Sequence, residues 1–278
     1  MRGLELAEVI PMTADEPFRH SMPELYDRYM SPLFFEPCAE LVAELARHFQ
    51  PNDILETAAG TGIVTRAVHR ALPGAKIVAT DVNEAMLQVA AQRLRSDQVS
   101  FQQANAQALP FDDDSFDLVL CQFGIMFFPD RVQANREAHR VLRSGGHYLV
   151  VTFDALERNP VAKIVGEAVG VLYPDDPPRY MEEGPFCYTD PLQIQDDLLA
   201  AGFAKIEVRT VTARSRAVSA HEAAFGICQG GPFRAEIEKR DPQGLERATD
   251  AAAEALRKFE GREGLQAPMS AHIAIASK

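Results

Sequence analysis

The chain has 278 residues, of which 46% are hydrophobic and 24% charged, a composition typical of a soluble globular protein. Its formal net charge is −12 and no Lys/Arg-rich tract offsets it. We therefore expect no nucleic-acid partner, because such binding depends on neutralising phosphates. No apolar run approaches the roughly 18 residues that span a membrane, so no membrane partner is expected. Residues 1–17 mix acidic with apolar residues and lack a signal-peptide core, which predicts a cytoplasmic protein.

The cysteines and histidines give no sign of a metal site. The four cysteines form no C-x-x-C pair, and the seven histidines show no H-E-x-x-H spacing. We expect reduced cysteines, as in a reducing cytoplasm, and no bound metal.

Residues 20–50 have a helical pattern, and Pro23, Pro32 and Pro37 mark breaks or first turns in it. We predict an N-terminal helical segment over residues 1–50.

From residue 52, short apolar strands alternate with helical patterns. The expected strands read DILET, AKIVAT, VSFQQ, FDLVLCQF and GGHYLVVTF, and helices are expected at 62–72, 83–95 and 130–143. Asp130 is the expected N-cap of the last helix, and the SGG at 144–146 its end. Continuous apolar strands alternating with helices predict an α/β fold with a parallel sheet covered on both faces.

After residue 154 the alternation is interrupted twice. A Pro- and aromatic-rich stretch precedes the helix that begins near Asp190, and further helices separate the strand KIEVRTVTA from a last strand in SAHIAIAS. We assign residues 51–278 to one domain with cap insertions at about 155–188 and 219–262.

The stretch ETAAGTG at 56–62 joins the first strand to its helix. Gly60 and Gly62 let the backbone approach a ligand without a side chain in the way. Glu56 puts a carboxylate beside the turn, which would repel a pyrophosphate and attract an ammonium group. A ligand with an amino acid end and a nucleoside end suits both features, although a tight turn without any ligand has the same local pattern.

Asp81 ends the second expected strand, and this position agrees with the spacing of about 20 residues at which an acid binds ribose hydroxyls. Taken alone, it could also cap the helix that begins near Asn83.

In this order, the motifs E-x-A-x-G-T-G, ATDVNEAML, ALPFDDDSFDLVL and HRVLRSGGHYLVV resemble the class I S-adenosylmethionine-dependent methyltransferases. The similarity covers residues 26–153 and is greatest to the small-molecule branch that includes the ubiquinone/menaquinone-biosynthesis methyltransferases. The resemblance implies a Rossmann-like, doubly wound, mostly parallel seven-stranded sheet whose last strand is antiparallel.

The same resemblance implies S-adenosyl-L-methionine as the cofactor and assigns roles to matching positions. The turn would hold the methionine portion, Asp81 the ribose, and the residues after the second and third strands the adenine. The implied cofactor-binding residues are Tyr29, Glu56, Ala58, Gly60, Thr61, Gly62, Asp81, Val82, Met86, Asn105, Ala106 and Gln122. Ala58 stands where many relatives have glycine, and Asn105 where most have aspartate.

The acceptor is expected to be a small organic molecule, hydrophobic or aromatic, methylated at O, N or C. Aromatic residues in and near the cap suggest this lining. Because a sulfonium carries a good leaving group, catalysis needs mainly alignment, and a base only where the acceptor must lose a proton. Tyr180, Tyr188 and His221 are the candidates for a base or an orienting group.

Two alternatives stay open at this point. An NAD-linked oxidoreductase could share the sheet, although the third glycine of G-x-G-x-x-G is absent. A non-catalytic protein could retain the cofactor pocket. The sequence gives no prediction of oligomeric state.

Overall fold

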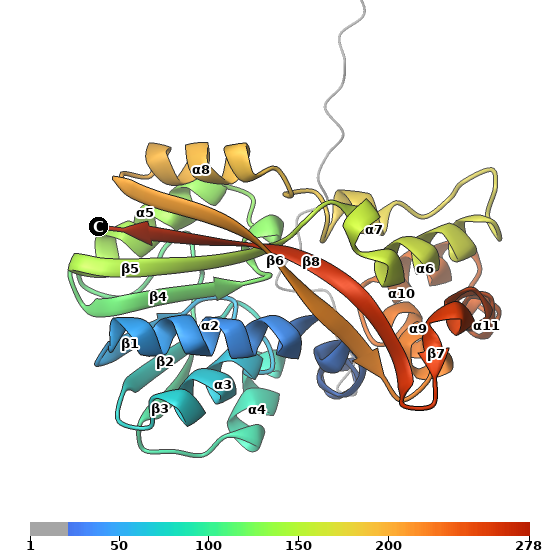
Figure 1. The fold of residues 1–278 in the computed structure, drawn as a ribbon, viewed down its shortest axis with the longest axis horizontal. Coiled ribbons are helices and arrows are strands. Elements are labelled where there is room, and N and C mark those ends of the chain that lie inside the picture. Colours follow the sequence, from blue (N-terminus) through green and yellow to red (C-terminus); the bar gives the residue numbers. More distant parts are fainter. Residues whose placement is uncertain (1–21) are drawn as a thin grey trace, which may run out of the picture.

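The computed structural model describes residues 22–278, so the first part of the expected N-terminal segment and the expected absence of a signal peptide lie outside the described residues. An eight-stranded sheet runs through the molecule in the order β3-β2-β1-β4-β5-β8-β6, with β7 paired to β8 (Figure 1). The strands are β1 (Asp53–Glu56), β2 (Lys76–Asp81), β3 (Val99–Gln103), β4 (Phe116–Gln122), β5 (Leu142–Phe153), β6 (Lys205–Ala217), β7 (Glu260–Gly261) and β8 (Gly264–Ser277).

The predicted Rossmann-like sheet is confirmed. Strands β1 to β5 are parallel, and β8 runs antiparallel between β5 and β6. The eighth strand, absent from the prediction, is the two-residue β7, which forms a hairpin with the start of β8. Central strands are apolar on both faces; Ile54 and Leu55 of β1, for example, are fully buried. This burial is expected when helices cover a parallel sheet on both sides.

Helices follow the strands of the first half of the sheet. They are α3 (Ile63–Ala71), α4 (Glu84–Arg93) and α5 (Arg131–Val141), with the short η2 (Ile125–Phe127) before α5. Asp130 caps α5 as expected, since its side chain accepts a hydrogen bond from the Gln133 N–H. The expected end at SGG is wrong: α5 ends at Val141, and β5 already begins at Leu142 with a register shift against β4.

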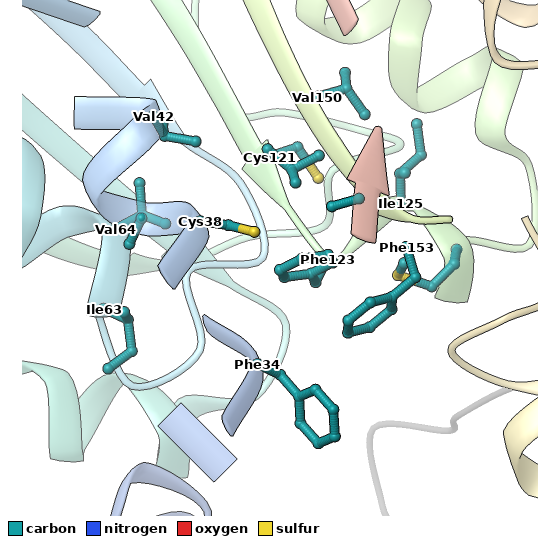
Figure 2. Close-up of a cluster of buried hydrophobic side chains, with 14 of the residues drawn as sticks. Phe34, Cys38, Val42, Ile63, Val64, Cys121, Phe123, Ile125, Val150 and Phe153 are labelled. Carbon is teal, nitrogen blue, oxygen red and sulfur yellow. The ribbon is translucent and has the colours of Figure 1, made fainter. Parts of the chain in front are cut away.

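The N-terminal part consists of α1 (Met22–Leu25), the π-helical η1 (Tyr26–Phe35) and α2 (Glu36–Phe49). Segment η1 contains Pro32 and packs against α2, α9 and β6. Figure 2 shows the hydrophobic cluster that this part completes. Phe34 and Cys38 lie near Ile63 of α3. They also lie near Phe123, the residue after β4, and Phe153, the last residue of β5. The N-terminal helices are thereby fixed to the sheet beside its strand ends.

Helices of the second half gather at one end of the molecule (Figure 1). They are η3 (Leu156–Arg158), α6 (Pro160–Gly170), α7 (Tyr180–Glu183), α9 (Ala220–Gln229), α10 (Phe233–Arg240), α11 (Leu245–Leu256) and η4 (Arg257–Phe259). Here α11 packs against α9 and α6, whereas α8 (Pro191–Ala200) packs against α5 at the sheet. Among residues 22–278, no helix combines the length and apolar character required to cross a membrane.

Candidate functional site

A cavity of about 290 Å³ lies beyond the carboxyl ends of β1, β2 and β4. This edge is where ligands bind in open α/β sheets. The loops after these strands form most of its wall, and η1 and α7 contribute from the side. Ten of the sequence-predicted cofactor residues lie on this wall: Glu56, Ala58, Gly60, Thr61, Asp81, Val82, Met86, Asn105, Ala106 and Gln122.

The two glycines of the first loop have different tasks. Both have positive φ, 55° at Gly60 and 76° at Gly62. A Cβ at Gly60 would meet no atom within 4 Å, so the bare backbone there faces open space on the cavity wall. A Cβ at Gly62 would lie 3.0 Å from the Ala90 Cβ, and Gly62 is not on the wall. Gly62 therefore permits α3 to pack on α4, and only Gly60 is placed to meet a ligand.

Ala58 also adopts the left-handed region, with φ at 52°. Alanine is strained there, by about 1–2 kcal/mol. Its methyl group occupies the space that a side chain at Gly124 would need. The loops after β1 and β4 thus interlock through Ala58 and Gly124, which explains how this chain accommodates alanine at the position.

Glu56 is a buried carboxyl group at the end of β1. The Thr65 hydroxyl donates a hydrogen bond of 2.5 Å to Glu56 Oε2. Burial raises the pKa of Glu56 to about 8, although the hydrogen bond from Thr65 opposes this shift. Burial thus favours the protonated form of Glu56, whereas a cationic ligand group beside it would favour the ionised form.

Asp81 joins the loop after β1 to the end of β2. Its Oδ2 accepts a hydrogen bond from the Gly60 N–H and its Oδ1 one from the Asn83 N–H, both at 2.8 Å. Burial raises the pKa of Asp81, and these backbone N–H groups act in the opposite direction. Each oxygen keeps a second lone pair for a ligand hydroxyl. Asn83, not Asp81, is the N-cap of α4, because its side chain accepts from the Ala85 N–H.

Two side chains on the cavity wall carry buried oxygen atoms without a partner among residues 22–278. They are Thr61 Oγ1 and Gln122 Oε1. The Gln122 Nε2 donates to the Phe35 carbonyl at 3.1 Å, which fixes the orientation of the amide. Buried polar atoms usually have partners, so these two indicate a polar ligand. Gly60 adds open space on the same wall, so this part of the cavity has both room and unpaired polar atoms for a ligand.

The expected adenine side is more open. Val82 is 47% exposed, whereas Met86 is buried. The Asn105 Oδ1 accepts a hydrogen bond of 2.9 Å from the Gln107 N–H, so this oxygen already stabilises its own turn. One lone pair of this oxygen and the amide N–H groups of Asn105 stay available to the adenine ring.

The structure does not bring Tyr29, Tyr188 or His221 to the cavity. Tyr29 packs edge-on against Phe225, with ring centroids 5.2 Å apart, and it is absent from the wall. The buried Tyr188 donates its hydroxyl to Asp197 Oδ2 at 2.8 Å. His221 is exposed in the first turn of α9. Of the three candidate bases, only Tyr180 lies on the cavity wall.

Sequence reasoning missed Tyr26 and Phe35, which line the cavity from η1. Their rings stack with centroids 5.1 Å apart. The π-helical winding of η1 changes which side chains share a face, and nothing in the sequence signals this rare winding. Tyr29, which the resemblance assigned to the cofactor, lies on the same segment but not on the cavity wall.

A family model described as "Methyltransferase domain" matches residues 55–150. The chain is 43% identical over 123 residues to the ubiquinone/menaquinone biosynthesis C-methyltransferase UbiE of Hahella chejuensis, a match that covers 42% of this chain and about half (48%) of that relative. It is 32% identical over 174 residues to the enzyme of the same name from Escherichia coli O1:K1, covering 58% of this chain and 69% of that relative.

Two solved structures share the fold. Phosphoethanolamine N-methyltransferase 2 of Haemonchus contortus, in complex with phosphomonomethylethanolamine and S-adenosylhomocysteine, superposes with a TM-score of 0.59 at 18% identity, covering 94% of this chain and 58% of that one. YcgJ of Bacillus subtilis has a TM-score of 0.55 at 22% identity, covering 86% and 97%. With the loop geometry at β1 and the sequence relatives, the conclusion is direct: the chain belongs to the class I S-adenosylmethionine-dependent methyltransferases.

Proposed function

We propose that this protein transfers the methyl group of S-adenosylmethionine to a small organic acceptor with a hydrophobic or aromatic body. The observation that carries the proposal is the pairing of two spaces. The cavity at the strand ends, which carries polar side chains on its wall, adjoins an apolar annex, a narrow space of about 60 Å³ between η1, the end of β5 and the cap helices. The residues common to both walls are Tyr26, Phe35, Phe123, Phe127, Tyr180 and Pro232.

The cavity at the strand ends would hold the cofactor. Glu56 would face the α-ammonium group, directly or through a water molecule, and Thr61 the methionine portion. The free lone pairs of Asp81 would accept from the ribose hydroxyls. The adenine would lie against the side chains after β2 and β3: Val82, Met86, Asn105 and Ala106.

The annex would hold the apolar end of the acceptor, whose other end would extend through the junction toward the cofactor cavity. Phe153, Phe186 and Phe233 are buried residues on its wall, and Met181 of α7 adds a flexible apolar side chain. Because α7 and α10 lie within the segments 155–188 and 219–262, we infer that these two segments form the acceptor side of the domain. Such a lining selects an apolar body and excludes water from it.

The chemistry requires little beyond alignment. When bound, S-adenosylmethionine supplies an activated methyl group on a positively charged sulfur. The chain's own residues then hold an acceptor atom in line with that methyl group, as the junction of the two spaces allows. Reduced cysteines support the expected cytoplasmic location: all four are free, and Cys38, Cys121 and Cys228 are buried.

Ligand-dependent unfolding tests the cofactor. S-adenosylhomocysteine at 100 times its Kd should add about 2.7 kcal/mol to the free energy of unfolding and raise Tm, whereas NAD(H) should leave Tm unchanged. The reverse result would favour an oxidoreductase.

A second measurement separates catalysis from mere binding. Methyl-labelled cofactor is incubated with a panel of small phenols, thiols and amines, and labelled product is detected by mass spectrometry. Transfer to an apolar acceptor supports the enzyme. Tight cofactor binding without transfer to any member would favour a non-catalytic binding protein.

A further inference from the structure

Two tyrosine residues lie where the cofactor cavity meets the apolar annex. Tyr26 comes from η1 and Tyr180 begins α7, and each lines both spaces. The rest of the annex wall is almost entirely aromatic or aliphatic. These two hydroxyl groups are therefore the side-chain polar groups that an acceptor in the annex would meet, among residues 22–278.

Both rings are held by neighbouring aromatic rings. Tyr26 stacks on Phe35 with centroids 5.1 Å apart, and Tyr180 stacks on Phe233 with centroids 6.0 Å apart. Within residues 22–278, neither hydroxyl forms a hydrogen bond with a protein group, in contrast to Tyr188, whose hydroxyl is bound to Asp197. The rings are thus positioned while their polar ends stay available to a ligand.

Both hydroxyls are held in the donor form. Burial raises the pKa of Tyr26 and that of Tyr180 well above the usual value for tyrosine. The negative charges of Asp81 and of an ionised Tyr180 raise the pKa of Tyr26 further. The geometry that brings the two residues together is their shared position on both walls. Both hydroxyl groups are therefore neutral and can donate a hydrogen bond to a ligand.

We propose that Tyr26 and Tyr180 are catalytic residues that donate two hydrogen bonds to one oxygen of the methyl acceptor and stabilise that oxygen as an anion beside the cofactor. The inference rests on the proposed function and adds the residues that act on the acceptor. Without such donors, an anion would be strongly disfavoured in an apolar annex. Preorganised donors aimed at a developing negative charge are an effective way to stabilise it.

The step balances as follows in atoms and charge. The acceptor hydroxyl releases its proton to water, and an electron pair of the resulting anion forms the bond to the methyl carbon. The carbon–sulfur bond breaks and its electron pair stays on sulfur, so the negative acceptor and the positive sulfonium become two neutral products. If a conjugated carbon of the anion attacks in place of oxygen, the proton on that carbon passes to water afterwards.

The probe 4-nitrophenol tests the donor pair, because its ionised form is visible by absorbance. The phenol is titrated with pH in the complex of the protein with S-adenosylhomocysteine. The proteins compared are the wild type, Tyr26→Phe, Tyr180→Phe and the double variant; phenylalanine keeps the ring packing. Tyr173→Phe is the matched control, since the Tyr173 hydroxyl is buried without a partner and lies outside both walls.

The ionisation constant of the bound probe should be at least tenfold larger in the wild type and in Tyr173→Phe than in the double variant, with the single variants between. Equal constants in the wild type and the double variant would overturn the proposal, as would an unchanged probe spectrum on adding the wild-type complex. Calorimetry of S-adenosylhomocysteine is run on the same samples. A wild type that does not bind it would contradict the proposed function itself, which is a separate result.

Discussion

At the scale of single residues, we propose that Glu56 faces the amino acid end of the cofactor and so favours ligands that carry this end. Changing Glu56 to Gln keeps size and hydrogen bonding but removes the charge that would face an α-ammonium group. We expect weaker binding of S-adenosylhomocysteine by about 1.5–3 kcal/mol, the range for a hydrogen bond to a charged group. Methylthioadenosine lacks the amino acid end and should bind almost as before. Competition binding on both proteins measures the difference. Equal losses of affinity for the two ligands would contradict the assignment of Glu56 to the amino acid end of the cofactor.

The raised pKa of Glu56 also gives a pH dependence of stability. The value rises from 4.5 to about 8 on burial, so between these pH values the folded protein holds a proton that the unfolded chain releases. The contribution of Glu56 to the free energy of unfolding therefore falls as pH rises through this window, by up to about 1.4 kcal/mol per pH unit. Urea unfolding at pH 5 and pH 8, without ligand, should show a smaller loss for Glu56→Gln than for the wild type. Parallel losses in the two proteins would contradict a buried, protonated Glu56.

Substituting alanine for the two glycines of the first loop should have different effects: at Gly60 mainly on ligand binding, at Gly62 mainly on stability. Gly60→Ala places a methyl group in open space on the cavity wall, so it should weaken S-adenosylhomocysteine binding while costing only about 1 kcal/mol of stability for the positive φ. Gly62→Ala presses on Ala90 and should lower the free energy of unfolding by about 1–3 kcal/mol more than Gly60→Ala does. Denaturation and calorimetry on both variants measure the two effects. Normal ligand binding by Gly60→Ala would contradict the placement of the ligand site at this loop.

At the scale of elements, an ion-pair cluster fixes η1 beside the cofactor cavity. The side chain of Asp27, only 9% exposed, accepts from Arg66 Nη2 at 3.2 Å and from Arg93 Nε at 3.1 Å. Arg66 also donates to the Thr61 carbonyl at 2.7 Å. One cluster therefore connects η1, which carries Tyr26, with α3, with α4 and with the cofactor loop.

Changing Asp27 to Asn should loosen η1 over the cavity. The loss of two charged hydrogen bonds predicts faster dissociation of S-adenosylhomocysteine and weaker affinity, by about 1–3 kcal/mol. Glu40→Gln is the control, because its pair with Arg70 is exposed on both sides and contributes little. Stopped-flow dissociation and calorimetry measure the effect. Equal dissociation rates and affinities in the two variants would mean that the position of η1, as fixed by the cluster, does not affect cofactor binding.

Some helices and strands can be predicted from the sequence, and others depend on tertiary packing. The alternation of buried strands and helices predicts the parallel sheet, and the oxygen of Asp130 correctly predicts the start of α5. The resemblance places Glu56 and Asp81 at adjacent strand ends. The π-helical winding of η1, whose Tyr26 lines the cavity, and the packing that buries Tyr188 against Asp197 depend on tertiary contacts. Local pattern carries no information about either.

At the scale of the whole molecule, the sheet and the cap helices share long strands. Strands β6 and β8 pair from Lys205–Ser277 to Ala217–Leu265, and they run from the end of the sheet opposite the cap helices to the end where those helices gather (Figure 1). The acceptor annex lies between these parts, with walls from both. A rigid connection between sheet and cap would therefore keep the annex aligned with the cofactor cavity.

Asn159 is the residue that tests this connection. It is 1% exposed at the start of α6, where its Oδ1 accepts from the Ser270 N–H at 3.1 Å and its Nδ2 donates to the Ser270 carbonyl of β8 and to the carbonyls of Asp154 and Ala155. Asn159→Ala leaves buried backbone groups without partners, which should lower the free energy of unfolding by about 2–5 kcal/mol. Because β8 belongs to both parts, hydrogen exchange should quicken alike in the helices α9 and α11 and in the central strands β4 and β5. Asn52→Ala, which alters an exposed side chain at the far end of β1, is the control and should change neither. Exchange that quickens in the cap helices alone would mean that the cap opens independently of the sheet, and the annex would then be a space that forms only when the two parts close.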